Sequence, residues 1–201
     1  ANGAIGRIDC HGVTLNLFPG NDVEGGPANL WLRRRDSDGV VAVPLLGPLS
    51  PLASLPGAGH EAQGLWQGLS INLQLRLADN EPAWFWHVQV DNHSADAQSL
   101  DLVLVQDIGL SSYGAIRVNE HYVSHYIDIT PLVHAGHGCV LAARQNLAVE
   151  ARHPWALVGS LRRGVSFATD ALQMQGLALR TGDIPHGITH GLPGARLQHE
   201  H

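Results

Sequence analysis

The strictest pattern in the chain is the alternation of apolar and polar residues over Leu69–Leu77. Every second position carries Leu or Ile, and the positions between them carry Ser, Asn, Gln or Arg. Because successive side chains of a β-strand point to opposite faces, this period of two predicts a strand with one buried face. Residues 79–82 predict a turn, and residues 84–90 alternate again. One face of this second strand carries Trp84, Trp86, Val88 and Val90.

Shorter apolar segments between Gly, Pro and Asn predict further strands. They are residues 8–11, 13–18, 30–34, 40–43, 100–105, 140–143, 156–159 and 165–168. We expect residues 69–77, 84–90 and 100–105 to form an antiparallel meander. The last of these is expected to be a central strand, because it is apolar on both faces. Residues 45–59 are rich in Pro, Gly and Ser and predict an ordered surface loop.

One short helix is predicted at residues 171–179. Thr169 or Asp170 would cap its N-terminus, and Gly182 follows its end. Many short strands with turn signals about every 8–12 residues are typical of an antiparallel β-sandwich. A length of 201 residues suits one domain, so residues 1–201 are expected to form a single, mainly β domain.

The charge pattern excludes several classes of function. The formal net charge is −6, and all 12 basic residues besides histidine are Arg. The one basic run, 33–35, is followed at once by Asp36 and Asp38, whereas a nucleic-acid-binding protein needs clustered positive charge. We therefore predict no nucleic-acid partner. The absence of Lys excludes Schiff-base chemistry and a Walker-type phosphate loop.

Compartment signals are few. No apolar run reaches the roughly 18 residues of a membrane helix, and no charged-then-apolar leader opens the chain. The first residue is Ala1 rather than Met, which suits a piece of a longer polypeptide. Free thiols at Cys10 and Cys139 in a reducing compartment are the simpler interpretation, and a single bridge stays open. A cytoplasmic location is expected, in a parent protein that is itself soluble or membrane-associated.

The 13 histidines raise the hypothesis of a metal site. Three pairs have spacings of three or four residues: His121 with His125, His134 with His137, and His186 with His190. Such a pair binds zinc from one face of a helix. However, residues 122–124 are aromatic and β-branched, and Pro and Gly surround the last pair, so neither segment is expected to be helical. HExxH and paired Cys are also missing, and we predict no metal ligand.

Catalytic patterns are equally sparse. Residues 109–113 lack the final Gly of a Gly-x-Ser-x-Gly nucleophile turn. Several carboxylates lie outside obvious turns, and no pattern shows that two of them converge for glycosidic acid–base chemistry. They are Asp107, Glu120, Asp128, Glu150 and Asp170. No catalytic residue is predicted.

Trp84 and Trp86 form the most notable aromatic pair. On alternate positions of one strand they are spaced by about 6.5–7 Å. Two such rings make a flat platform on which the C–H faces of sugar rings can stack. The alternative is that both fill the core of the sandwich, and Val88 and Val90, which continue the same face, favour that alternative.

A series of short motifs occurs in a distinctive order. The series is NG (2–3), NLWLRRRDSDG (29–39), GPLSP (47–51), VDNHS (90–94), NEHYVSHYID (119–128), VLAAR (140–144), HPW (153–155), FATD (167–170) and GDIP (182–185). Together, from Asn2 to about Leu197, they resemble the N-terminal β-supersandwich of glycoside hydrolase family 94. Cellobiose phosphorylase and cyclic β-1,2-glucan synthase belong to that family. Residues 171–177 (ALQMQGL) depart from the Arg- and Gly-rich helix usual there.

The resemblance implies a supersandwich similar to galactose mutarotase, continued in the family by further strands. It also implies a separate α/α barrel that holds the general acid and the site for inorganic phosphate, so that no catalytic residue or cofactor is carried by this chain. The implied partners are a β-linked glucan or disaccharide, that barrel, and a second copy of the chain in a homodimer. The implied parent activity is inverting phosphorolysis or synthesis of β-linked glucans.

By position, residues 120–128 and the following loop to Gly138 would reach the sugar. The candidate carbohydrate-contacting residues are Glu120, His121, Tyr122, His125, Tyr126, Trp84 and Trp86. The function predicted for this chain is to shape the sugar site without catalysing the reaction. One alternative is a free-standing carbohydrate-binding module that uses Trp84 and Trp86. A second alternative is a histidine–metal enzyme built on a β-sandwich.

Overall fold

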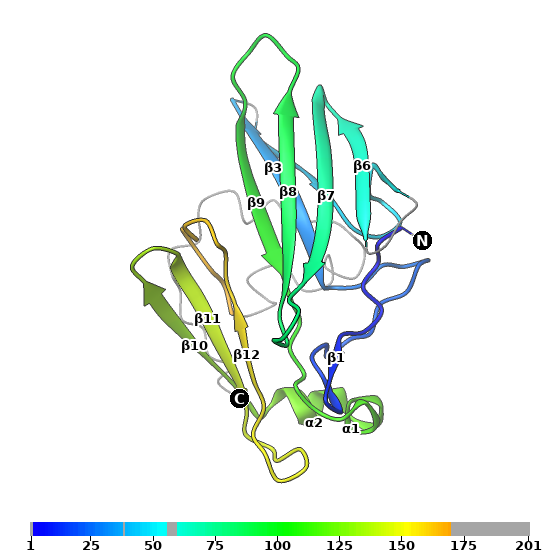
Figure 1. The fold of residues 1–201 in the computed structure, drawn as a ribbon, viewed down its shortest axis with the longest axis vertical. Coiled ribbons are helices and arrows are strands. Elements are labelled where there is room, and N and C mark those ends of the chain that lie inside the picture. The colour runs from blue at the N-terminus through cyan, green and yellow to red at the C-terminus, as the bar shows by residue number, and fades with distance from the viewer. Residues whose placement is uncertain (1, 38, 56–59, 170–201) are drawn as a thin grey trace. The chain divides into compact units, whose positions relative to one another are not determined.

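The computed structural model describes residues 2–37, 39–55 and 60–169. Antiparallel strands dominate it, with two short helices (Figure 1). The chain divides into two compact units, which are described separately. The first comprises Ala1–Gly6 and Gly20–Val105, and the second comprises Arg7–Pro19 and Gln106–His201.

The first unit contains two antiparallel sheets. The four-stranded sheet has the order β5-β6-β7-β8 and is made of β5 (Leu52–Ser54), β6 (Glu61–Trp66), β7 (Leu69–Leu77) and β8 (Trp84–Asn92). The three-stranded sheet has the order β4-β3-β9 and is made of β3 (Asn29–Asp36), β4 (Gly39–Pro44) and β9 (Ser99–Val105). Both halves of the strong alternation in the sequence are therefore strands, and β7 and β8 pair along their whole length.

The core of the first unit lies between these two sheets. Leu30 and Leu32 of β3 are buried in one cluster with Leu69, Ile71 and Leu73 of β7. Each fully buried side chain of this size stabilises the fold by about 1.5–3 kcal/mol. Two sheets that bury their apolar faces against each other make a β-sandwich, which confirms the predicted fold class.

The predicted meander is wrong at its third strand. β9 pairs with β3 and not with β8, so the loop after β8 carries the chain from one sheet to the other. β9 also lies at the edge of its sheet, while β3 is central. Leu102 and Leu104 remain substantially exposed on this edge strand. An apolar run therefore does not by itself distinguish a central strand from an edge strand.

Other differences concern weak strand signals. The predicted loop 45–59 contains β5, and β6 was not expected because Gln63 and Gly64 interrupt its apolar pattern. Residues 165–168 do not form a strand: Gly164 makes an isolated bridge with Gly138, and Ala168 is a single bridge residue. The predicted helix at 171–179 lies outside the described residues.

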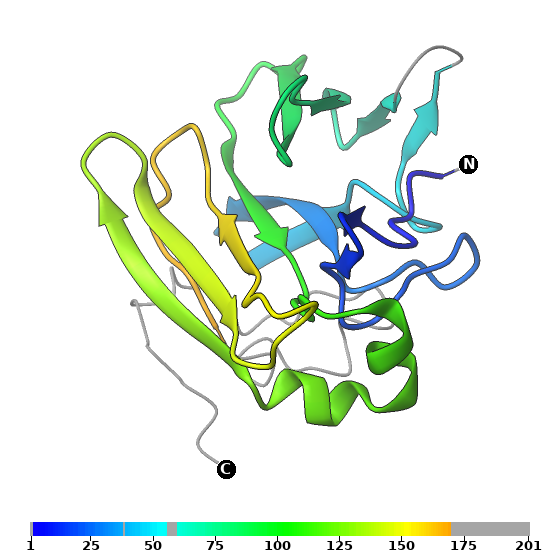
Figure 2. The ribbon, with the colours of Figure 1, turned by 60° about the horizontal axis from the view of Figure 1, so that its bottom comes forward.

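The second unit combines a short ladder, two helices and a three-stranded sheet (Figure 2). The ladder joins β1 (Asp9–Cys10) to β2 (Val13–Thr14). The helices are α1 (Tyr113–Val118) and α2 (Glu120–Ser124), and they lead directly into the sheet. That sheet has the order β10-β11-β12, from β10 (Ile127–His134), β11 (Gly138–Gln145) and β12 (Trp155–Val158). β10 was not predicted from the sequence.

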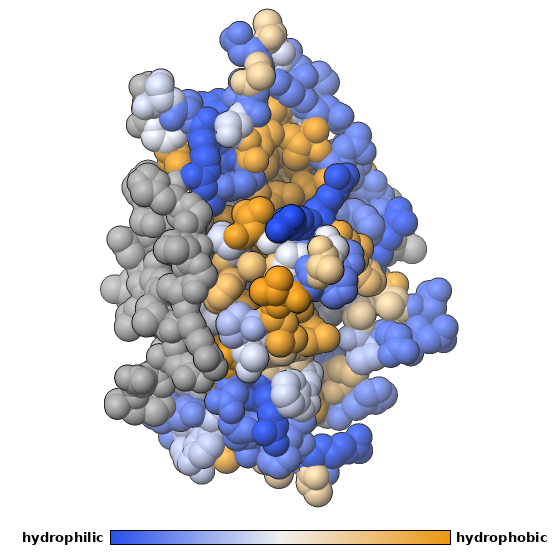
Figure 3. All heavy atoms as spheres, turned by 90° about the vertical axis from the view of Figure 1, so that its left-hand side faces the viewer, coloured by the Kyte–Doolittle hydropathy of each residue, from blue (hydrophilic) through white to orange (hydrophobic). Residues whose placement is uncertain are grey.

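Large hydrophobic side chains such as Val118 and Val133 are exposed, and Figure 3 shows hydrophobic surface, in orange, set among hydrophilic surface on one face. Cys10 and Cys139 are both free, as the simpler interpretation of the sequence had it. In the described ranges, no helix is both long enough and apolar enough to cross a membrane.

Candidate functional site

Two exposed tyrosines mark the candidate site, which lies in the second unit. Tyr122 belongs to α2, and Tyr126 belongs to the turn that leads into β10. Their ring centroids are 5.1 Å apart and their planes are tilted by 58°. Tyr122 is 51% exposed and Tyr126 is 38% exposed, so both rings are accessible to a ligand. Amphipathic rings of this kind offer an apolar face and a hydroxyl to one ligand.

A short helix positions the pair, although the sequence predicts no helix here. That prediction is wrong because the N-cap residue outweighs the low helix propensity of Tyr and Val. The Asn119 side chain accepts a hydrogen bond from the Tyr122 backbone N–H at 2.9 Å and so begins the helix. Val123, only 1% exposed, anchors the opposite face in the interior. Tyr122 and Tyr126 are four positions apart, a spacing that brings side chains together on one side of a helical turn.

Buried polar contacts fix this turn to the neighbouring sheet. Gln145 of β11 is fully buried, and its side-chain amide donates hydrogen bonds to the backbone oxygens of Gly109 and Val123. The backbone N–H of Asn146 donates a hydrogen bond to the backbone carbonyl oxygen of Tyr126 at 2.8 Å. These positioning residues were not found from the sequence, since nothing in an isolated Gln-Asn pair indicates which carbonyl groups it will meet.

The polar surroundings suit a neutral polyhydroxylated ligand. A hydrogen bond and the charge of Tyr122 raise the pKa of Tyr126 above its ordinary value. A tyrosine hydroxyl with its ordinary pKa of about 10 is already protonated at neutral pH. A protonated phenol both donates and accepts hydrogen bonds. Glu120 lies in the first turn of α2, and His121 and His125 are exposed on the same short segment. The structure therefore brings five of the predicted contact residues together on residues 120–126.

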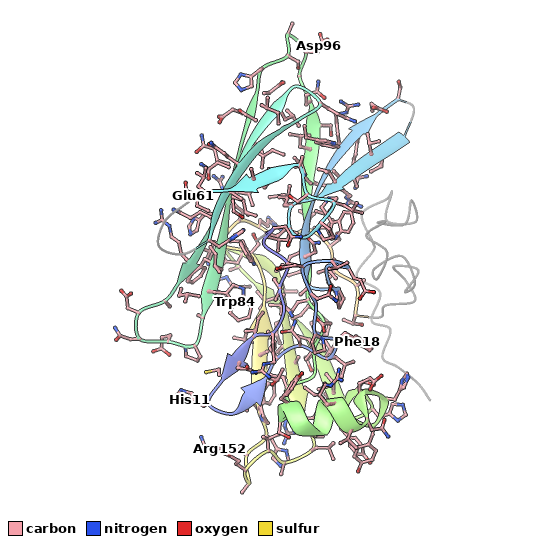
Figure 4. All side chains as sticks on the ribbon, turned by 90° about the vertical axis from the view of Figure 1, so that its right-hand side faces the viewer. His11, Phe18, Glu61, Trp84, Asp96 and Arg152 are labelled. Atoms are coloured by element: carbon pink, nitrogen blue, oxygen red, sulfur yellow. The ribbon has the colours of Figure 1, made fainter. Side chains whose placement is uncertain are left out.

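The two predicted tryptophans belong to the first unit. Trp84 opens β8 beside the turn from β7, and Figure 4 labels it there. Trp86 packs against the core cluster and stands edge-on to His60, with ring centroids 5.9 Å apart. Both rings are half-buried. This packing favours the core-filling alternative for Trp86 over an open platform for sugar.

The histidine pairs do not converge with further ligands in the part of the chain that the structure describes. Within it, no group of three or more His, Cys, Asp or Glu side chains is arranged to hold a metal ion. His134 and His137 stack at 4.7 Å, and the His134 Nδ1 accepts hydrogen bonds from the backbone of Gly136 and His137. His186 and His190 lie outside the described residues.

A cleft of about 430 Å³ opens elsewhere in the second unit. Its lining comes from the β1–β2 turn, the start of α1 and the loop after β11, as Gly12, Ser111, Ser112, Ala115 and residues 147–150. Glu150 lines it with a left-handed backbone (φ 48°), which is strained for a residue other than glycine. The lining pairs this one carboxylate with serine hydroxyls, and neither a histidine nor a second carboxylate belongs to it. Such a set does not make an acid–base pair.

Comparison with known proteins decides the family. The sequence matches the family described as the SOGP N-terminal domain over residues 1–201. The chain belongs to this family. It is also 27% identical over 200 residues to a 1,2-beta-oligoglucan phosphorylase of Listeria innocua serovar 6a (strain ATCC BAA-680 / CLIP 11262). These findings confirm the resemblance to an N-terminal domain of family 94 enzymes.

The match also shows how small a part of the relative this SOGP N-terminal domain represents. The aligned region covers 99% of this chain and 18% of the relative. The chain thus spans less than a fifth of the curated protein it matches. The activity named for that relative belongs to a much longer polypeptide.

Proposed function

We propose that this SOGP N-terminal domain is a non-catalytic β-sandwich that shapes the sugar site of an enzyme acting on β-linked glucans. The parent activity is phosphorolysis of a 1,2-β-linked oligoglucan, as the name of the relative suggests. The parent carries a catalytic α/α barrel that binds inorganic phosphate, and its sandwich is of the galactose-mutarotase type. A homodimer and a cytoplasmic location complete the proposal, and the free Cys10 and Cys139 thiols support a reducing compartment.

The observation that carries the proposal is the exposed pair of Tyr122 and Tyr126 on a turn held by hydrogen bonds to β11 and Asn146. The rings offer C–H stacking to a glucose unit, and the protonated Tyr126 hydroxyl exchanges hydrogen bonds with sugar hydroxyls. Glu120 adds an acceptor, and His121 adds a ring with one donor and one acceptor when neutral. Together these groups bind and orient a glucan segment, while bond cleavage takes place in the barrel.

The test uses an enzyme that carries this domain, with Tyr122→Ala and Tyr126→Ala. Each ring contributes about 0.5–1.5 kcal/mol to an aromatic contact, so KM for a 1,2-β-oligoglucan should rise about 2- to 12-fold. The value of kcat should stay within twofold, because the rings touch no reacting bond. Val118→Ala, at an exposed site on α1, is the matched control and should leave KM unchanged. An unchanged KM in both tyrosine variants would contradict the proposed sugar contact.

A further inference from the structure

The sheet of the second unit aligns a second set of ligand-binding side chains on one face. In its register Asp128 of β10 opposes Arg144 of β11, and Arg144 opposes Trp155 of β12. Residues directly opposite in antiparallel strands project to the same face, so these three form one row. With strands about 4.8 Å apart, the row is about 10 Å long, enough for more than one sugar ring.

The aromatic end of this row is open. Trp155 is 60% exposed, although Trp is one of the side chains that gain most from burial. The next row of the same face runs from Thr130 through Ala142 to Leu157. Ala142, at its middle, is buried, whereas Thr130 and Leu157 at the two ends of this row are exposed.

The other two members of the row have unused hydrogen-bonding capacity. The Arg144 guanidinium carbon lies 5.7 Å from the centre of the Trp155 ring, and the Arg144 Nε is shielded from water without a hydrogen-bond partner. Asp128 accepts one bond, from the Asn146 side chain at 2.8 Å. Among the ion pairs of the described residues, none joins Arg144 to Asp128. A donor and an acceptor thus stand side by side without satisfying each other.

We propose that this face is a second glucan-binding surface, formed by Trp155, Arg144 and Asp128. A glucose unit stacks its C–H face on Trp155, and its hydroxyls accept hydrogen bonds from Arg144 and donate to Asp128. The ligand is a neutral polyol rather than a phosphate, because the Asp128 carboxylate repels an anion. It is not a purely apolar partner, because charged groups fill two thirds of the row. The surface lies on other residues than the tyrosine pair and shares only its ligand class, β-linked glucan, with the proposed function.

The test is a titration of the purified chain with linear 1,2-β-glucan oligosaccharides, in which calorimetry and tryptophan fluorescence measure binding. Trp155→Ala should weaken binding by about 2- to 12-fold, the range of one aromatic contact. Arg144→Lys keeps the charge and loses the planar fork, and should also weaken binding. Leu161→Ala is the matched control, since Leu161 is 65% exposed in the same unit. Trp155→Ala and Leu161→Ala should have the same melting temperature as the unmodified chain, because both side chains are largely exposed.

The outcomes separate this surface from the tyrosine site. Loss of binding in Trp155→Ala and not in Tyr122→Ala supports the surface even if the tyrosine site fails. Loss in Tyr122→Ala alone overturns the surface and leaves the proposed function intact. Absence of glucan binding up to millimolar concentration overturns it as well. A change of oligomeric state in Trp155→Ala, without a change in glucan binding, would show that the face contacts a second copy instead.

Discussion

At the scale of single residues, neighbouring positive charges determine whether the pKa of a partly buried carboxyl group is lowered or raised. Asp101 of β9 accepts hydrogen bonds from the guanidinium groups of Arg33 and Arg35, which both belong to the neighbouring strand β3. Burial alone would raise its pKa, but the hydrogen bonds and charges of Arg33 and Arg35 outweigh burial and hold the pKa below its ordinary value. Asp107, in the second unit, receives donors from Asn16, Leu17 and Phe18, yet burial raises its pKa.

The lowered pKa of Asp101 predicts how stability depends on pH. A carboxyl group with a depressed folded-state pKa stabilises the fold above its unfolded pKa, near 3.9, and this contribution is lost as pH falls through the folded-state pKa. Asp101→Asn should therefore lose less unfolding free energy than the unmodified chain between about pH 5 and pH 2. Urea unfolding across this range measures the difference.

The same substitution should lower stability at pH 7 by about 1–3 kcal/mol, because the buried Arg33 loses its paired carboxylate. Asp36→Asn serves as the control, since its pair with Arg34 is long and exposed and should contribute less than about 1 kcal/mol. A parallel loss of stability with falling pH in Asp101→Asn and the unmodified chain would contradict the assigned role of Asp101.

At the scale of elements, periodicity predicted the strictly alternating strands, missed several weaker ones, and did not predict which strands pair. Strict alternation predicts β7 and β8, because β7 buries Leu69, Ile71 and Leu73 on one face and the matching face of β8 is half-buried. The sequence does not predict β6, because Gly64 interrupts its apolar pattern. Gly64 is required by the close approach of the neighbouring segment at Pro51 and Leu52. A Cβ at Gly64 would collide with the carbonyl oxygen of Pro51 at the start of the β5–β6 pairing. Close approach of two backbones leaves no signature in hydrophobic periodicity.

Gly64→Ala is therefore predicted to destabilise the chain by about 1–3 kcal/mol, as overpacking does. Gly114→Ala is the matched substitution. An added Cβ at Gly114 of α1 meets no atom within 4 Å, so this change should stabilise the helix by up to about 1 kcal/mol. Thermal unfolding of the two variants should give shifts of opposite sign, and equal shifts would contradict the packing described for β5 and β6.

Helix α2 gives the second prediction at this scale. The sequence signal for it was present in Asn119, a preferred N-cap residue, but the aromatic and β-branched residues that follow suggested otherwise. Asn119→Ala should lower the free energy of unfolding by about 1 kcal/mol and make the positions of the Tyr122 and Tyr126 rings less fixed. Near-ultraviolet circular dichroism reports the tyrosine environment, and an unchanged tyrosine signal would show that the cap does not position the pair. Asn119→Asp retains the capping oxygen and should preserve the tyrosine signal of the unmodified chain.

At the scale of the whole molecule, the order of motifs identified the family although no single motif did. The candidate contacts at Glu120 to Tyr126 are implied by that resemblance, and they remain a prediction. Trp84 and Trp86 were predicted as sugar contacts from their spacing alone, and spacing does not distinguish a buried face from an exposed one. Trp155 was not predicted as a contact, because its exposure depends on strands that are distant in the sequence.

The central claim is that this domain binds glucan without cleaving it. The direct measurement is an NMR time course of the purified chain with a 1,2-β-glucan oligosaccharide and inorganic phosphate. The account predicts saturable broadening of the sugar signals with no new anomeric phosphate signal. Appearance of glucose 1-phosphate, or sugar signals that stay sharp at every concentration of the chain, would contradict it.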